Sequence, residues 1–352
     1  VVAGCECVGM TAHALQHVGE VADCLTGARL HRERAPDQPL AFVELAALHG
    51  HHAEEMERVE LLGHGRQDPA VRPLGVIETA GAMGGDRLAK GGRMRATGDD
   101  LDLMIFAGVY RDEFLCEPAV AAMLAGDLEM RSDVYRESGN SFALDVLNGS
   151  LGFFNAIQTG INMINSGKAS NALIVASEIE NNLGPWPDNL MGIEETGAAM
   201  FLKKSEDGSG FGDIVFKKFP KYSNSLIVEN YWVDTKPFLE VVRDEHLEDF
   251  YVECMVETVG EMMMKARLDL DKIAKVFPQQ FSPSFIQKLT KALNLQPQKV
   301  VDVTTGKKDL FTSSIPYALH QAISSNEVKK GDIGLIISAG SGIQVGCALY
   351  YF

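Results

Sequence analysis

The stretch Ser141–Phe154, with the sequence SFALDVLNGSLGFF, decides the fold that we expect. An extended apolar run ends in the small residues Asn148, Gly149 and Ser150, and a helical segment begins at Gly152. Strand, tight turn and helix together present a side chain at a helix N-terminus, where the helix dipole favours developing negative charge. Ser150 is therefore a candidate nucleophile, although on local pattern alone a helix cap is the commoner explanation.

Similar patterns of apolar and polar residues occur on both sides of this stretch. Short apolar runs bounded by polar residues predict buried strands, and longer amphipathic segments predict helices. The expected strands are 101–107, 171–176, 333–337 and 344–350, and the expected helices are 152–166, 250–268, 313–324 and, with apolar residues on one side, 41–58. Alternating strands and helices imply an α/β fold in two similar halves.

A polar, glycine-rich run at 204–210, KSEDGSG, cannot supply core and separates the two halves. We therefore expect an N-terminal half at 1–203 and a C-terminal half at 211–352. The tertiary placement of the first hundred residues does not follow from their sequence.

Composition excludes several classes of function. The 352 residues carry a formal net charge of -16, which disfavours binding to nucleic acid or to anionic membranes. The six cysteines are scattered without paired spacing, which indicates reduced thiols. No basic segment leads into an apolar one at the N-terminus, and no apolar run approaches the roughly 18 residues of a membrane helix. We expect a soluble cytoplasmic protein.

The segment 336–346, IISAGSGIQVG, runs from an apolar strand through a glycine turn into another strand. Glycines at 340 and 342 allow backbone N–H groups to approach a ligand or an oxyanion closely. An ordinary hairpin explains the pattern equally well.

Two of these segments and two others resemble one family. Residues 145–153, DVLNGSLGF, resemble the nucleophile segment of the 3-oxoacyl-acyl-carrier-protein synthase III enzymes of the thiolase superfamily, in which cysteine stands at the position of Ser150. Residues 277–282, FPQQFS, resemble the Pro-His-Gln-Ala-Asn segment of that family, which puts Gln279 at the catalytic histidine.

The other two segments lie further along the chain. Residues 308–316, KDLFTSSIP, are similar to the family's Gly-Asn-Thr-Ser run before Ser-Ile-Pro, which puts Asp309 at the catalytic asparagine. Residues 339–346 resemble the closing glycine segment, in which the position of Gly342 helps to form the oxyanion hole together with the nucleophile, here Ser150. The four motifs occur in the family's order across residues 100–352.

The resemblance implies a thiolase-like, five-layered αβαβα fold of two pseudo-equivalent halves, usually assembled as a homodimer. It also implies acyl-coenzyme A or acyl-carrier-protein partners, so that a coenzyme A or phosphopantetheine thioester is the substrate. No tightly bound cofactor and no metal are expected.

All three positions of the family's Cys-His-Asn set are changed, and each change has a chemical consequence. A serine hydroxyl needs a base where a thiol ionises more readily. Gln279 can donate a hydrogen bond but cannot shuttle protons. Asp309 can accept a proton, yet its charge opposes the enolate formed when a malonyl group decarboxylates. Decarboxylative condensation is therefore disfavoured.

Two hypotheses follow from these departures. Relatives with serine at the nucleophile position are associated with choosing starter acyl units, and relatives with aspartate at the asparagine position with acyl transfer to oxygen or nitrogen. The leading hypothesis is thus acyl transfer through Ser150 in fatty-acid or polyketide-type biosynthesis, with Asp309 as base or orienter. The alternative is a catalytically degenerate subunit that forms a heterodimer with an active paralogue.

Histidines elsewhere provide weaker signals. Three histidines and one carboxylate occur at short spacing within 49–55, namely His49, His51, His52 and Glu55. These side chains could bind a metal ion, but a solvated helix end is the commoner explanation. His246 and His320 are not expected to replace the missing base.

Two further segments are assigned structural roles. The loop at 110–113, YRDE, follows a strand and is more simply a solvated loop or dimer contact than a functional one. The run Met262–Met264 is expected to pack a helix and not to line an acyl tunnel.

Overall fold

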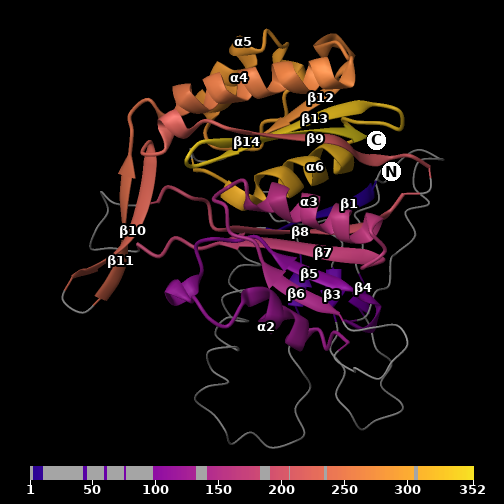
Figure 1. Cartoon of the computed structure of the whole chain (residues 1–352), viewed down its shortest axis with the longest axis vertical. Coiled ribbons are helices and arrows are strands. Elements are labelled where there is room, and N and C mark those ends of the chain that lie inside the picture. Colours follow the sequence, from indigo (N-terminus) through magenta and orange to yellow (C-terminus); the bar gives the residue numbers. More distant parts are fainter. Residues whose placement is uncertain are drawn as a thin grey trace, which may run out of the picture.

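The computed structural model describes residues 98–131, 141–182, 191–205, 207–233, 236–304 and 308–352, together with the backbone of four strands at 3–10, 43–45, 59–61 and 75–76. Figure 1 shows these parts as alternating layers of helices and strands. Within them, no helix is both long and apolar enough to cross a membrane.

Nine of the described strands are hydrogen-bonded in the order β12-β13-β14-β9-β1-β8-β7-β5-β6. One half contains β1 (Ala3–Met10), β5 (Leu103–Phe106), β6 (Phe142–Asp145), β7 (Asn171–Glu178) and β8 (Thr196–Lys204). The other contains β9 (Gly210–Lys218), β12 (Lys275–Pro278), β13 (Ile333–Gly340) and β14 (Gln344–Tyr351). The two halves meet at β1 and β9, through the pair Ala3–Phe211.

The two halves repeat one pairing pattern. In the first, β5 is parallel to β7, and β7, β8 and β1 then follow as antiparallel neighbours. In the second, β12 is parallel to β13, and β13, β14 and β9 follow as antiparallel neighbours. This repetition is the internal pseudo-equivalence that the sequence resemblance implied.

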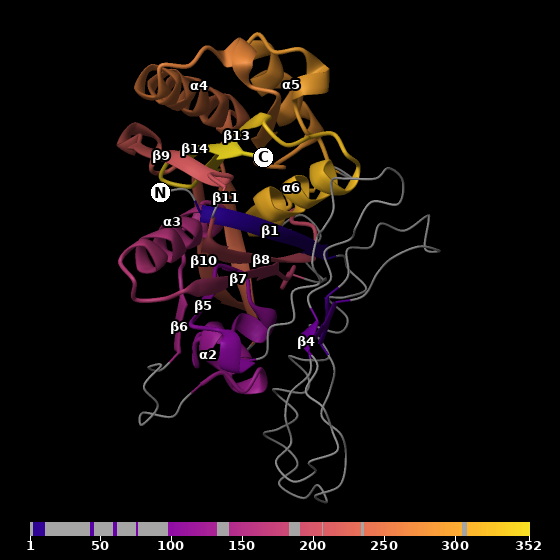
Figure 2. The same cartoon turned by 90° about the vertical axis from the view of Figure 1, so that its right-hand side faces the viewer.

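Helices fill the remaining three layers, as Figures 1 and 2 show. The central layer contains α3 (Gly152–Asn165) and α6 (Ser314–Ser324), whose buried residues join the core between the two half-sheets. The outer layer over β9, β13 and β14 is formed by α4 (Leu247–Ala266) and α5 (Pro283–Ala292). On the opposite side, α2 (Val120–Asp127) covers β5 and β6. The order is αβαβα.

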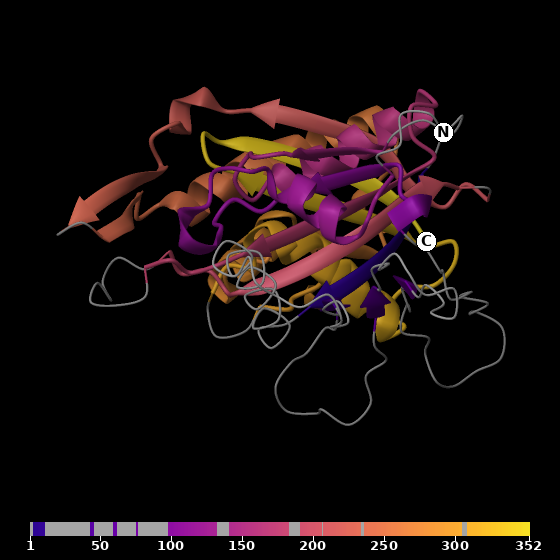
Figure 3. The same ribbon diagram turned by 90° about the horizontal axis from the view of Figure 1, so that it is seen from below.

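Two smaller sheets lie outside these layers. The hairpin of β10 (Leu226–Val233) and β11 (Lys236–Arg243) reaches beyond the edge of the layers in Figures 1 and 3. The other sheet joins β2 (Val43–Leu45), β3 (Val59–Leu61) and β4 (Gly75–Val76).

Most of the elements expected from the sequence are confirmed, with one correction. The strands and helices predicted after residue 100 are present, with bounds shifted by a few residues. The helix expected at 41–58 is wrong at 43–45, because Val43 and Leu45 pair with β3 in an antiparallel ladder; the rest of that segment lies outside the described residues. The β8 strand ends at Lys204 and β9 begins at Gly210, while the division into halves at 1–203 and 211–352 stays a prediction.

Candidate functional site

Ser150 lies in the tight turn between β6 and α3, two residues before the helix begins. Gly149 has a φ of +54°, a conformation that favours glycine, and Ser150 is buried at 4% exposure. The turn packs against the glycine segment that ends β13: a Cβ on Gly340 would lie 2.9 Å from the carbonyl oxygen of Asn148. This close approach brings two of the predicted motifs together.

The end of β13 holds Ser150 through two hydrogen bonds. The hydroxyl of Ser150 donates to the carbonyl oxygen of Ala339 at 2.5 Å, and the hydroxyl of Ser338 donates to the carbonyl oxygen of Ser150 at 3.2 Å. Because α3 begins just after the turn, its positive dipole end faces this region. The site is therefore suited to developing negative charge near Ser150.

Gln279 follows β12 and connects the same strand to Asp309. Its side-chain oxygen accepts the N–H of Ala339 at 3.1 Å, and its Nε2 donates to Oδ2 of Asp309 at a long 3.5 Å. Gln279 is 1% exposed. The structure therefore brings Gln279 and Asp309 together, and both Gln279 and Ser150 bond to Ala339.

Asp309 is a buried carboxylate with a high pKa. Burial raises its pKa to about 7, against the lowering effects of the N–H of Phe311, the charge of Arg243 and the amide of Gln279. The Phe311 N–H donates to Oδ1 at 2.8 Å. A group with a pKa near neutrality exchanges protons readily at physiological pH, as a general acid or base must.

Glu178, at the end of β7, is a second buried carboxylate that sequence reasoning missed. It accepts hydrogen bonds from the backbone of Val109 at 3.1 Å and of Tyr110 at 2.7 Å, and from the hydroxyl of Thr312. Burial raises its pKa to about 8, and the charge of Asp309 adds to the increase. The available signal was an acidic residue at the end of an apolar strand, with Glu180 two residues later.

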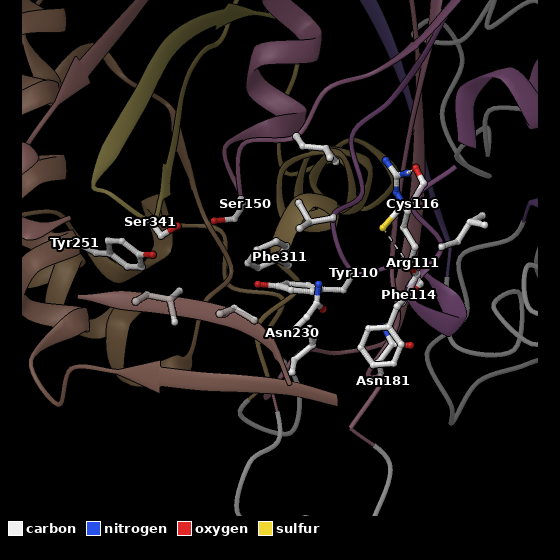
Figure 4. Close-up of a pocket in the computed structure, with 17 residues that line it drawn as sticks. Tyr110, Arg111, Phe114, Cys116, Ser150, Asn181, Asn230, Tyr251, Phe311 and Ser341 are labelled. Carbon is white, nitrogen blue, oxygen red and sulfur yellow. Dashed lines mark hydrogen bonds between the residues drawn. The ribbon is translucent and has the colours of Figure 1, made fainter. Parts of the chain in front are cut away.

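Ser150 lines an open cavity of about 410 Å³, shown in Figure 4. Its walls come from the Ser150 turn, the loop after β5, the β10–β11 hairpin, α4 and the loop between β13 and β14. The lining residues include Tyr110, Arg111, Ser150, Asn181, Asn230 and Phe311. Gln279 and Asp309 are both buried, and neither is among the residues that line this cavity.

The loop at 110–113 differs from its expected role. Tyr110 and Arg111 line the cavity, and the Arg111 side chain is only 8% exposed and ion-paired with Asp145 at 2.6 Å. Tyr110 packs its ring 5.1 Å from that of Phe311. The expectation of a solvated loop is wrong for Tyr110 and Arg111, because the N–H of Tyr110 donates to the buried Glu178 and Arg111 pairs with Asp145. The alternative of a dimer contact stays a prediction.

Gly342 has a φ of +104°, which requires glycine, and lies in the turn between β13 and β14. Its neighbour Ser341 lines the cavity together with Ser150, whereas Gly342 is not among the residues that line the cavity. The oxyanion-hole role of Gly342 stays a prediction.

The remaining candidates lie away from this cavity or outside the described residues. His49, His51, His52 and Glu55 are not described, and no cluster of three or more metal-ligating side chains occurs in the part of the chain that the structure describes. Met262 lies on the buried face of α4, whereas Met264 of the same helix is exposed, which agrees with helix packing. His246 and His320 are not among the residues that line the cavity.

Comparison with known proteins agrees with the resemblance that the sequence motifs indicated. Residues 263–352 match the family model described as 3-oxoacyl-[acyl-carrier-protein (ACP)] synthase III C terminal. The beta-ketoacyl-[acyl-carrier-protein] synthase III of Clostridium perfringens strain 13 is 26% identical over 266 residues, which cover 72% of this chain and 79% of the relative. The protein of the same name from Aquifex aeolicus is 27% identical over 253 residues, covering 71% and 77%.

Solved structures show the same fold. The crystal structure of the Aquifex aeolicus synthase III matches with a TM-score of 0.61 and 24% identity, covering 73% of this chain and 79% of that one. A cysteine-to-serine variant of Xanthomonas campestris OleA with bound lauric acid and lauroyl-CoA matches with a TM-score of 0.62 and 19% identity, covering 73% and 77%. The resemblance to synthase III and the thiolase-like αβαβα fold are thereby confirmed.

Proposed function

From this thiolase-like fold and its similarity to synthase III, we propose that the protein is a transferase that handles acyl thioesters of coenzyme A or acyl-carrier protein in fatty-acid or related biosynthesis. Its reaction is acyl transfer through Ser150 and not ordinary decarboxylative condensation. The observation that carries the proposal is the open cavity that reaches the hydroxyl-bearing turn at the N-terminus of α3. A filled cavity would instead have favoured a scaffold without chemistry.

In the proposed first step, Oγ of Ser150 adds to the thioester carbonyl carbon. A C–O bond forms, the C–S bond breaks, and the pantetheine sulfur leaves with the proton that the serine gave up. In the second step, an oxygen or nitrogen nucleophile takes the acyl group and restores the hydroxyl. Backbone N–H groups near α3 and the glycine turn at 340–342 are the candidate donors to the oxyanion.

Asp309 is the proposed base or orienter for this chemistry. Its pKa of about 7 suits proton exchange, and Gln279 ties it to the strand that accepts the serine hydroxyl. Once ionised, Asp309 adds negative charge beside the site, which opposes the enolate of a decarboxylative condensation. Acyl transfer needs no such enolate.

The OleA variant supports this choice of substrate. That protein carries serine in place of a cysteine and was solved with lauric acid and lauroyl-CoA bound, so a serine-bearing protein of this fold holds an acyl thioester. Homodimerisation and a cytoplasmic location remain predictions, which gel filtration and cell fractionation would test.

Acyl–enzyme formation is the direct test. The purified protein is incubated with a panel of acyl-CoA thioesters, and its intact mass and the free thiol released are measured. We expect one acyl adduct, mapped to the peptide containing Ser150, and its loss in Ser150→Ala. Ser341→Ala is the matched control because Ser341 lines the same cavity and should keep the adduct. Absence of both adduct and thiol release with every thioester would sink the proposal.

One observation favours the alternative of a degenerate subunit. The proton of Ser150 is donated to the carbonyl oxygen of Ala339, a group that cannot take it up. Under this alternative, the protein lacks activity alone and partners a cysteine-containing paralogue. Co-purification with such a paralogue, and activity only in the mixture, would distinguish it from the first proposal.

A further inference from the structure

Glu178 joins two segments of the cavity wall that are far apart in the sequence. On one side, its carboxyl group accepts the N–H groups of Val109 at 3.1 Å and of Tyr110 at 2.7 Å. On the other side, it accepts the hydroxyl of Thr312. Glu178 and Thr312 are both buried, and neither is among the residues that line the cavity. Any effect of this pair on a bound ligand is therefore exerted through the segments that it holds.

One of these segments contains a strained wall residue. Phe311 lines the cavity and has a φ of +47°, in the left-handed region that a bulky side chain rarely adopts. Such a conformation is costly and persists only where the surrounding structure holds it. The N–H of Phe311 donates to Oδ1 of Asp309 at 2.8 Å, and the next residue, Thr312, donates to Glu178. Two buried carboxyl groups thus hold the strained turn at successive residues.

The two wall segments also meet directly. The rings of Tyr110 and Phe311 pack with their centroids 5.1 Å apart, and Figure 4 shows them next to each other in the cavity that Ser150 also lines. The ring contact and the hydrogen bonds of Glu178 form a closed circuit through Tyr110, Phe311 and Thr312. A shift of either segment would therefore displace both rings in the wall.

We infer that Glu178 is a positioning residue for the proposed acyl transfer. Through Tyr110 and Thr312 it fixes the cavity wall, and through the same turn it helps to orient the carboxyl group of Asp309. A misplacement of about 1 Å can cost about 10²-fold in rate, so a residue that does not touch the substrate can have a large effect. This inference rests on the proposed function, since it assumes that an acyl group occupies the cavity next to Ser150.

Thr312 allows the connection to be broken without changing a residue of the cavity wall. Thr312→Val removes the hydroxyl that Glu178 accepts, and Thr312→Ser keeps it. Acylation by the fastest-reacting acyl-CoA is followed by intact mass, and the rate constant and the half-saturating concentration are determined per acylated site. We expect Thr312→Val to lower the ratio of these two quantities by between about tenfold and 10²-fold. Thr312→Ser should stay within about threefold of the unmodified protein.

Thr290→Val is the matched control for the loss of a buried hydroxyl. Thr290 lies in α5, and its hydroxyl donates to the carbonyl oxygen of Ile286 at 2.7 Å. This control should lower stability, and hence the fraction of folded protein, but leave the kinetic constants per acylated site unchanged. Unchanged constants in Thr312→Val, or an equal loss in Thr312→Ser or Thr290→Val, would overturn the inference.

Hydrogen exchange tests the hydrogen bonds of Glu178 independently of acyl transfer. In Thr312→Val, the amides of Val109 and Tyr110 should exchange about tenfold faster, as for the loss of one buried hydrogen bond, and in Thr290→Val they should not change. Unchanged exchange in Thr312→Val would overturn the inference whatever the chemistry. Faster exchange in a protein that forms no acyl adduct with any thioester would refute acyl transfer and restrict Glu178 to holding the wall.

Discussion

The hydroxyl of Ser150 donates a hydrogen bond of 2.5 Å to the carbonyl oxygen of Ala339, a residue 189 positions further along the chain. The N–H of the same alanine donates to Gln279, which in turn donates to Asp309. One residue of β13 thus connects the three residues that the resemblance to synthase III predicts to be catalytic. Because the carbonyl cannot accept the proton outright, the serine hydroxyl must turn from Ala339 before it attacks a thioester.

Replacing Ser150 with cysteine should accelerate acylation. A thiol near a helix N-terminus ionises more readily than a hydroxyl and does not depend on Asp309 for activation. We expect Ser150→Cys to form the acyl adduct at least about tenfold faster, by quenched-flow mass spectrometry. The comparison is made in a Cys116→Ser background because Cys116 lines the same cavity. A slower variant would mean that the geometry at 150 is tuned to serine.

Acylation should depend on pH through Asp309. Since its pKa is about 7, the ionised form that can accept a proton grows as the pH rises from 6 to 8. The acylation rate should therefore rise over this range in the unmodified protein. Asp309→Asn should lower the rate by about 10²–10⁴-fold and remove the titration. An unchanged profile in Asp309→Asn would assign the base to another group.

Stability should fall with rising pH in the same range. The folded pKa values of Asp309 and Glu178 lie above those of exposed carboxylates, so between about pH 4 and 7–8 the folded state binds more protons than the unfolded state. The free energy of unfolding then decreases as the pH rises through this window. Between pH 5 and pH 8, the free energy of unfolding of Asp309→Asn should fall by on the order of 2 kcal/mol less than that of the unmodified protein. Urea titrations of both proteins at the two pH values measure this difference. Parallel pH profiles for the two proteins would contradict the high pKa.

Glu178 should be needed to hold the cavity wall. Glu178→Ala leaves the N–H groups of Val109 and Tyr110 without their acceptor, which we expect to cost about 2–4 kcal/mol of stability. Thr312→Val removes only the hydroxyl partner and should cost less. Thermal unfolding of both variants at one pH gives the comparison, and a milder effect for Glu178→Ala would show that the backbone finds other acceptors.

Two glycine-to-alanine substitutions should change the stability of the protein in opposite directions. Gly340→Ala places a Cβ 2.9 Å from the Asn148 carbonyl oxygen and 3.2 Å from Leu151, so it should destabilise the Ser150 turn by about 1–3 kcal/mol. Gly260, within α4, has nothing within 4 Å of its added Cβ, and Gly260→Ala should stabilise by up to about 1 kcal/mol. Denaturant titrations of the pair provide the measurement. Equal effects would mean that the close approach at Gly340 relaxes without cost.

The fold was accessible from the sequence because its signals are local. The strand, turn and helix around Ser150 follow from apolar runs and small residues, and the turn glycines at 149 and 342 have the positive φ values that only glycine adopts easily. Four motifs in one order then identified the resemblance to synthase III, and with it the layered architecture. At 43–45, the periodic spacing of apolar residues was the only signal and predicted a helix. These residues instead form a strand that pairs with β3.

The site depended on contacts that no local pattern encodes. The sequence by itself, through its resemblance to synthase III, determined which residues we predict at the nucleophile, histidine and asparagine positions. Only the tertiary structure decided that Gln279 donates to the buried Asp309, and that Arg111 lines the cavity while paired with Asp145. The physical reason is distance along the chain. Glu178 reaches Thr312 across 134 residues and Ser150 reaches Ala339 across 189, and such pairs are fixed by strand order in the assembled sheets.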